Sequence, residues 1–301
     1  MDVLVLGSAA GGGFPQWNCG CAQCSGVRSG APGLIARTQD SVAVSAGGAW
    51  FLINASPDVG AQLGRHAQLW PQSGRGSPIA GVVLTNGDID HTLGLFVLRE
   101  WQPLVVYATP RVWQGLQQNA MLRSLQRFEG HLIFRPLDLG RQAELLGPLG
   151  EPSGLALEAF ETPGNPPLHL ANKFESSPED NVGLSLSSKR GGSAIYASSS
   201  ASAEPLRARA DGADLLLIDG TFWSDDEPFA FDASRSARAM GHIPISGPDG
   251  SLEALAGTRV GQRVYTHVNN TNPVLDEHSL PRKHVTDAGF SVAEDGMRFS
   301  F

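Results

Sequence analysis

The chain has few cysteines. Its 301 residues include only three, and all of them fall between Cys19 and Cys24. A disulfide framework would use an even number of cysteines spread along the chain. The scarcity therefore argues against a secreted, disulfide-stabilised protein, and we expect a reducing, cytoplasmic location.

Basic clusters and long apolar runs are also missing. The formal net charge is −8, and the 22 lysines and arginines occur singly or in pairs. Such a surface repels phosphate, so we expect no nucleic-acid partner. No apolar run reaches the roughly 20 residues that span a bilayer. The apolar start, residues 1–7, carries Asp2 where a secretory signal needs basic residues.

What is present indicates a globular protein rich in turns. Hydrophobic residues make up 41% of the chain, which is too many for a disordered polymer. The length allows one large domain or two ordinary ones. The 36 glycines and 20 prolines predict tight turns and long ordered loops.

Apolar runs and their breaks predict alternating strands and helices. Strands are expected at residues 1–7, 41–45, 50–54, 79–85, 103–107, 182–187, 193–197, 214–218 and 263–266, with further strand signals over 131–160. Helices are expected after residue 91 and over 111–127 and 203–211. Two halves of strands with helices outside predict an α/β fold of the αββα type.

Three of these strands end in side chains that can do chemistry. Asp90 and His91 follow the apolar run 79–85, Asp219 follows the strand at 214–218, and His267 follows the strand at 263–266. The ends of such strands gather at one rim of the fold. Taken alone, the Asp90–His91 pair could be metal ligands, an acid/base pair or a helix N-terminal cap.

Two loops are expected to lie near this rim. The glycine-rich loop 7–15 follows the first strand, but its spacing matches neither the dinucleotide fingerprint nor the P-loop. We interpret it instead as backbone that passes close to the active site. The polar, proline-rich segment 163–180 is expected to be an ordered loop or a lid over a site.

The three thiols are expected to bind a metal ion. Cys19, Cys21 and Cys24 have spacings that let them converge on one tetrahedral ion, and we expect structural zinc. Three unrelated reduced cysteines are the alternative, but no other cysteine occurs in the chain. A fourth ligand must come from a distant part of the sequence.

These motifs resemble a known superfamily. The segment Asn86-x-Asp88-x-Asp90-His91 aligns with the HxHxDH motif of the metallo-β-lactamase superfamily, and the cysteine cluster looks like the structural zinc motif of its phosphodiesterase branch. More closely, the chain resembles the pyrroloquinoline quinone (PQQ) biosynthesis protein B family. The resemblance is carried by residues 6–19, 36–39, 54–58, 219–223 and 267–273. It implies a single metallo-β-lactamase-like αββα domain over 1–301, with the Cys-rich structural-metal loop at 17–26.

The chain departs from the superfamily pattern at one of the two metal positions. Where imidazoles are usual it has Asn86, Asp88 and either Asp180 or Asn181, and Ser198 stands where a bridging carboxylate is expected. The other position keeps its ligands. The resemblance thus implies Asp90, His91 and His267 as the ligands of an active-site Fe(II), the set used by non-haem iron oxygenases rather than by two-zinc hydrolases.

Further roles follow from the resemblance. Asp219 is a candidate fourth iron ligand or a carboxylate that orients a histidine, and we count it with His242 as catalytic. The alternative for His242 is a residue that merely flanks a helix. Asn270 takes the position of the fourth zinc ligand, although an amide oxygen suits zinc poorly. We treat His66, His131 and His169 as surface residues.

The implied function is a step in PQQ biosynthesis. The family resembles an iron- and O2-dependent hydroxylase that acts on the tyrosine moiety of a glutamate–tyrosine precursor. Two alternatives remain. One is a non-catalytic carrier that aids transport of PQQ or its precursor to the periplasm, and the other is a metal-dependent hydrolase. The resemblance is also compatible with a homodimer.

Overall fold

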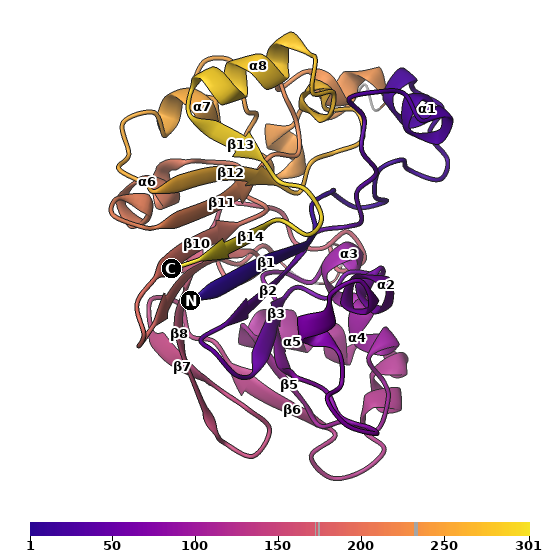
Figure 1. Cartoon of the computed structure of the whole chain (residues 1–301), viewed down its shortest axis with the longest axis vertical. Helices are drawn as coiled ribbons and strands as arrows, with labels where there is room; N and C mark the ends of the chain where they lie inside the picture. The colour runs from indigo at the N-terminus through magenta and orange to yellow at the C-terminus, as the bar shows by residue number, and fades with distance from the viewer. Residues whose placement is uncertain (172, 174, 232–233) are drawn as a thin grey trace.

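The structure is a computed structural model that describes residues 1–171, 173, 175–231 and 234–301. Two mixed β-sheets face each other, and helices cover the outer face of each sheet (Figure 1). This four-layer arrangement confirms the αββα fold expected from the sequence. Across the described residues, no helix combines the length and the apolar character needed to cross a bilayer.

The first sheet is built mainly by the N-terminal half of the chain. Its seven strands, in spatial order, are β14 (Arg298–Ser300), β1 (Asp2–Gly7), β2 (Ser41–Ser45), β3 (Trp50–Ile53), β4 (Ile79–Val83), β5 (Leu104–Ala108) and β6 (Leu132–Pro136). Strands β1, β2 and β3 pair in antiparallel fashion, and β3 to β6 are parallel. The C-terminal β14 adds to the free edge of β1, antiparallel to it.

The second sheet is built by the C-terminal half. Its seven strands, in spatial order, are β13 (Phe290–Val292), β12 (Gln262–Thr266), β11 (Leu215–Asp219), β10 (Ser193–Ala197), β9 (Val182–Ser188), β8 (Pro152–Glu161) and β7 (Gln142–Leu146). Strands β10 to β13 are parallel, and the β7–β10 part is antiparallel. The expected 182–187/193–197 hairpin is confirmed as β9 and β10.

Short helices lie outside the sheets. They are α1 (Ala22–Ser29), α2 (Val59–Gly64), α3 (Ile89–Thr92), α4 (Gly94–Val97), α5 (Pro110–Gln117), α6 (Glu204–Ala210), α7 (Ser251–Ala254) and α8 (Leu280–Asp287). The helix expected over 111–127 was wrong in its extent. It ends at Gln117, and a separate 3-10 helix, Ala120–Leu125, follows. The side chain of Asn119 accepts from the Met121 N–H, and this local cap competes with continuation of the helix.

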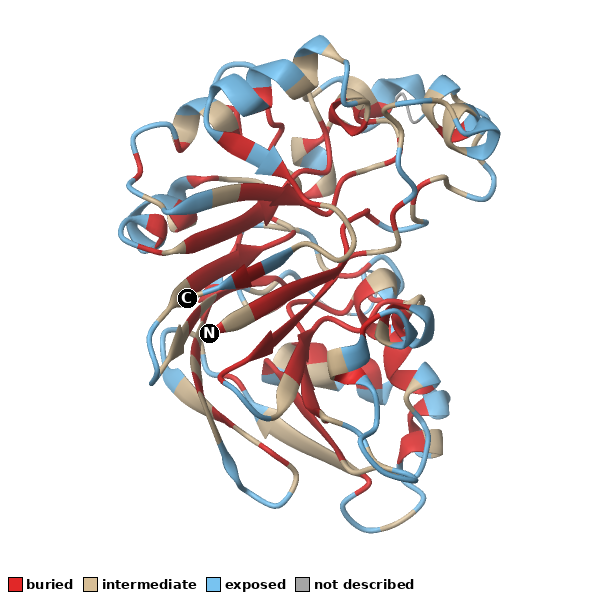
Figure 2. Ribbon diagram, in the orientation of Figure 1, coloured by how far each residue is buried: buried red, intermediate tan, exposed pale blue. Residues whose placement is uncertain are grey.

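The apolar side chains form three layers of core. Residues such as Val44, Phe51 and Leu217 fill the space between the two sheets. A second cluster packs the outer face of the first sheet against α2, α4 and α5, and a third packs the second sheet against α6 and α8. The central strands β2, β4, β5 and β11 are therefore buried on both faces (Figure 2), which explains why they read as continuous apolar runs.

Candidate metal centre and adjoining pocket

The carboxyl end of β4 leads into the loop that carries Asp88, Asp90 and His91. The last two lie in the single turn of α3. Asp88 occupies the N-cap position, but its side chain makes no capping hydrogen bond. The helix-cap interpretation therefore does not account for these side chains.

His91 is buried and has its ring orientation fixed. Its Nδ1 lies 2.8 Å from Oδ1 of Asn86, an acceptor that places the ring proton on Nδ1. The other ring nitrogen, Nε2, is buried and has no hydrogen-bond partner among the described residues. A buried, unpartnered nitrogen lone pair is costly unless something binds it, and a metal ion would do so.

His267 approaches this pair from the second sheet. It follows β12 with φ of 55°, a left-handed conformation that is unusual for a residue other than glycine. Its Nε2 lies 3.3 Å from Oδ2 of Asp90, and its Nδ1 lies 2.9 Å from the hydroxyl of Thr221. The ligand atoms of Asp90, His91 and His267 all lie within 4.8 Å of one another.

The charges of this cluster suit a cation. Burial lowers the pKa of His91 to about 4, which keeps its imidazole neutral. Burial also opposes charge on Asp90 and His267, but their neighbours outweigh it. His91 and His267 hold the pKa of Asp90 well below its usual range, and Asp90 raises the pKa of His267 to about 9. Without a metal ion, a proton on His267 therefore neutralises Asp90. An ion at the cluster would compete with this proton.

Asp219 and His242 form a second pair beside the first. Nδ1 of His242 lies 2.8 Å from Oδ2 of Asp219, and the His242 and His267 rings stack with centroids 5.6 Å apart. The Thr221 hydroxyl donates to Oδ1 of Asp219 at 2.6 Å, and the Ser200 N–H donates to Oδ2 at 3.1 Å. Because both oxygens of Asp219 already accept hydrogen bonds, the geometry favours an orienting carboxylate over a fourth ligand.

Two side-chain amides, which bind each other, occupy positions where the superfamily usually has metal-binding imidazoles. Nδ2 of Asn86 lies 3.3 Å from Oδ1 of Asn181, and Asn181 also donates to the carbonyl oxygen of Asn165. Of the two candidates at this position, Asn181 is therefore the one that faces Asn86. Asp180 instead forms an ion pair with Arg111 at 3.0 Å, and Ser198 is buried nearby.

The glycine-rich loop passes directly over the cluster, as interpreted from the sequence. A Cβ atom added to Gly11 would lie 3.3 Å from Oδ2 of Asp90. The loop is held there by pairing with the segment after β12, since the N–H of Ala10 donates to the carbonyl of Val268. The loop thus needs glycine where the backbone meets the Asp90 carboxylate.

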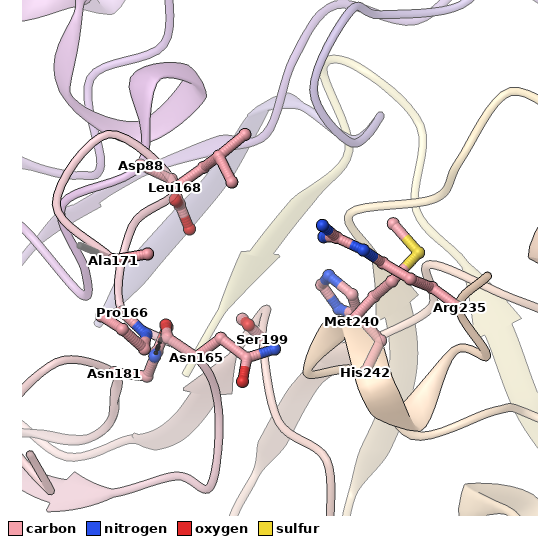
Figure 3. A pocket seen from close by; sticks show the side chains of 10 residues that line it. All are labelled: Asp88, Asn165, Pro166, Leu168, Ala171, Asn181, Ser199, Arg235, Met240 and His242. Carbon is pink, nitrogen blue, oxygen red and sulfur yellow. Dashed lines mark hydrogen bonds between the residues drawn. The ribbon is translucent and has the colours of Figure 1, made fainter. Parts of the chain in front are cut away.

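A pocket of about 390 Å³ opens beside the cluster (Figure 3). Asp88 and His242 lie on its walls, together with Arg235 and Met240. The segment expected to be a lid contributes four lining residues: Asn165, Pro166, Leu168 and Ala171. Residues 172 and 174 of that segment lie outside the described residues. The volume is within the range of small-molecule sites.

Asp88 is the acidic group of this pocket. Burial raises its pKa to about 6, and the neighbouring charge of Asp90 adds to the rise. Its carboxylate is part of neither metal-ligating group found near the pocket among the described residues.

The three cysteines converge in space. Their sulfur atoms lie within 4.8 Å of one another, and Cys21 caps α1 by accepting from the N–H of Cys24. Burial raises the pKa of Cys24 to about 11 in the absence of an ion. The side-chain amide of Asn270 lies 3.2 Å from Sγ of Cys19 and 3.5 Å from Sγ of Cys24. Exchanging the amide N and O would turn an oxygen toward the thiols.

The structure adds residues that the sequence did not reveal and corrects others. Thr221, which contacts Asp219, His242 and His267, was quoted only as part of a motif. Arg235 lies in a polar stretch that carries no pattern. The assignment of His66 and His131 to the surface was wrong, because both are buried, whereas His169 is exposed.

Comparison with known proteins places these features in context. Residues 49–268 match the family described as beta-lactamase superfamily domain. The chain is 42% identical to coenzyme PQQ synthesis protein B of Rhodopseudomonas palustris strain TIE-1, over 98% of each chain. It is 40% identical to the protein of that name from Gluconacetobacter diazotrophicus, over 100% of this chain and 99% of that protein.

Solved structures give the same picture. The zinc-bound PqqB from Methylobacterium extorquens superposes with a TM-score of 0.92 at 40% identity, covering 100% of both chains. A diphosphatase of the PhnP family, at 20% identity, has a TM-score of 0.67 over 100% of this chain and 97% of that one. The second likeness shows the shared fold alone.

Proposed function

The chain belongs to the coenzyme PQQ synthesis protein B family within the beta-lactamase superfamily, and on this premise we propose that it is a PQQ-biosynthetic hydroxylase. In this proposal it uses Fe(II) and O2 to hydroxylate the tyrosine moiety of a glutamate–tyrosine precursor. The names of its relatives support the PQQ pathway. The hydroxylation step rests on the chemistry of the site.

The observation that carries the proposal is the set of ligands at the rim. Asp90, His91 and His267 offer one carboxylate and two imidazoles, the donor set of non-haem Fe(II) oxygenases. The unpartnered Nε2 of His91 fits a metal ion at this point. A two-metal hydrolase would need imidazole ligands for its second ion. At that position this chain has the paired amides of Asn86 and Asn181.

The overall reaction balances with one external reductant. A ring C–H bond of the tyrosine moiety becomes C–OH with one oxygen atom of O2, and the other oxygen atom leaves as water. Two electrons and two protons come from a reductant such as ascorbate. Bound iron would supply the redox chemistry with O2 that amino-acid side chains lack.

The side chains of this chain would orient and move protons. Asp219 accepts from Nδ1 of His242, so Nε2 of His242 is left to take or give a proton at the substrate in the pocket. Thr221 holds the Nδ1 side of His267, and Asn86 does the same for His91. Both histidines would thus direct Nε2 toward the ion.

The second part of the proposal concerns the cysteine loop. We propose that Cys19, Cys21 and Cys24 bind a structural Zn(II), with Asn270 as a fourth ligand through its side-chain oxygen. The converging sulfur atoms and the adjacent amide support it. Asn270 lies three residues after His267, so this zinc would also brace the strand end that carries an iron ligand.

The decisive experiment compares metals under controlled oxygen. The metal ion at Asp90, His91 and His267 is first removed, and the protein is reloaded anaerobically with Fe(II). With ascorbate present, this protein should consume O2 and hydroxylate a synthetic glutamate–tyrosine precursor. The same protein loaded with Zn(II) should not. Equal turnover with zinc would contradict the assignment of an iron-dependent hydroxylase. Cleavage of phosphodiesters or lactams would instead favour a hydrolase.

Variants distinguish a catalytic protein from a non-catalytic carrier. His242→Gln should keep the iron and lose about 100-fold or more in hydroxylation rate, because it removes a proton-transfer group. His169→Gln, at an exposed histidine, is the matched control and should retain the wild-type rate. If Asp90→Ala and His267→Ala leave PQQ production by cells intact, the protein acts as a carrier.

A further inference from the structure

A second pocket, of about 470 Å³, adjoins the pocket of Figure 3. The segment 163–180 contributes to both: Leu168 lines the first pocket, whereas Lys173 lines the second. The loop after β4 divides in the same way, since Asp88 lines the first pocket and Ile89 the second. The two pockets therefore share a wall, and the second is large enough for a small molecule.

Apolar side chains form much of the lining of the second pocket. Ile89 and Leu93 lie four residues apart and are 61% and 38% exposed. Leu116 of α5 and Leu170 are buried in the same lining. Leu170 can lie against α5 because Gly115 has no side chain, and a Cβ atom added there would lie 2.5 Å from Cδ1 of Leu170. The exposed apolar surface in this hollow would gain stability if an apolar group covered it.

The charge of the second pocket is unlike that of the rest of the surface. The chain has a net charge of −8, yet neither Asp nor Glu occurs among the described residues of this lining. Four other pockets each have at least one acidic lining residue: Asp88, Glu158, Glu144 and Glu100, respectively. The second pocket is therefore suited to an anionic group, which an acidic lining would repel.

Lys173 supplies a positive charge at this pocket. The chain has three lysines, and two of them pair with acids at 2.7 Å: Lys189 with Glu144 and Lys283 with Asp287. Lys173 forms no ion pair with any residue that the structure describes, and it is exposed at the edge of the lining. Its ammonium group can donate up to three hydrogen bonds, and a carboxylate is a strong acceptor for them.

We propose that the second pocket binds a small molecule with an apolar body and one carboxylate group. The apolar body would cover Ile89 and Leu93, and the carboxylate would accept from the ammonium group of Lys173. Such a ligand would contact both the segment that lines the first pocket and α3, which carries Asp90 and His91. The inference does not depend on which metal ion or reaction the protein uses.

Calorimetry with octanoate tests the binding. Acetate, which lacks the apolar body, and 1-octanol, which lacks the charge, are the comparison probes. The wild-type protein should bind octanoate about fivefold or more tightly than either. Lys173→Gln should lower the affinity for octanoate to that for 1-octanol and leave 1-octanol unchanged. Lys189→Gln, at a lysine of another pocket, should match the wild type.

Two further measurements locate the ligand, because a carboxylate can also reach a metal ion at the rim. Saturating octanoate should slow acetylation of Lys173 by acetic anhydride about fivefold or more, and leave the other two lysines unchanged, as followed by mass spectrometry. Leu93→Asp, which places an acid in the lining, should abolish the preference for octanoate over 1-octanol. Leu149→Asp, at an exposed leucine outside the pocket, should keep it. Thermal unfolding checks that each variant is folded.

Four results would overturn the inference: no binding of octanoate, equal affinity of the wild-type protein for octanoate and 1-octanol, unchanged affinity in Lys173→Gln, or equal acetylation of Lys173 with and without octanoate. These outcomes are distinct from a failure of the proposed function. The probes report on the second pocket without turnover, whereas the hydroxylase proposal stands or falls on O2 consumption by the Fe(II) protein.

Discussion

Nε2 of His267 lies 3.3 Å from Oδ2 of Asp90, although 177 residues separate them in the chain. Each residue follows a strand of a different sheet, so the contact joins the two halves of the molecule at the rim. The candidate metal centre thus depends on how the sheets sit against each other, as well as on the loops that carry its ligands.

Replacing His267 should remove the rim metal selectively. We choose His267→Asn because asparagine tolerates the positive φ of 55° better than alanine does, so backbone strain is not the cause of any effect. Affinity at the rim should fall by about 100-fold or more. Metal analysis should then find two ions per chain in the wild type and one, at the cysteines, in the variant. Two ions in the variant would refute the ligand assignment, and His169→Asn serves as the control.

Cys24→Ser should destabilise the N-terminal loop. Cys24 is completely buried, and without its thiolate the proposed zinc site would keep only two sulfur ligands. We expect loss of one zinc ion and a cost of about 3 kcal/mol or more in the free energy of unfolding. Limited proteolysis should cut the 17–30 region faster than in the wild type. Ser29→Ala, on the same helix, should behave as wild type, and an unchanged zinc content in Cys24→Ser would contradict the assignment.

Glu227 should make stability depend on pH. Burial raises its pKa from 4.5 to about 7, although the Thr271 hydroxyl and the Trp223 N–H oppose the rise. Because the folded state holds this proton more tightly, its contribution to stability is full below about pH 4.5 and is lost as pH rises through 7.

Glu227→Gln is the corresponding variant. Its amide can accept from Trp223 and donate to Thr271, so it mimics the protonated acid at every pH. Between pH 5 and 8 the wild type should lose on the order of 2 kcal/mol relative to the variant, a value reduced for the partial exposure of the side chain. Urea unfolding at several pH values measures this. Parallel curves for the two proteins would contradict it, and Glu129→Gln is an exposed control.

Tyr196→Phe should weaken the contact between the sheets. The Tyr196 hydroxyl, from the second sheet, donates to Asp40 and accepts from Nδ2 of Asn54 at 3.1 Å. Removing it leaves both partners short of a hydrogen bond in a buried place, at a cost of about 1–3 kcal/mol. Tyr265→Phe should cost less, because among the described residues its hydroxyl pairs with that of Ser251 alone. Denaturant unfolding compares them, and an equal or smaller loss for Tyr196→Phe would count against this view.

How much the sequence could predict depended on the kind of signal. Buried strands give long apolar runs, so the sites of Asp90, Asp219 and His267 at strand ends were predictable. Thr221 and Arg235 were not, because a hydroxyl or guanidinium in a loop has no periodicity to mark it. The break after Gln117 depended on one side-chain cap, and the burial of His131 depended on packing against Phe128, with ring centroids 4.5 Å apart.

The pairing of β14 with β1 also bears on synthesis of the protein. Strand β1 is translated long before its partner at the sheet edge, which begins only at Arg298. Until that late segment emerges, β1 presents an open strand edge on which other nascent chains can pair. The first sheet is therefore complete only after β14 has been made, and the unpaired edge of β1 exposes the chain to aggregation in the interval before it.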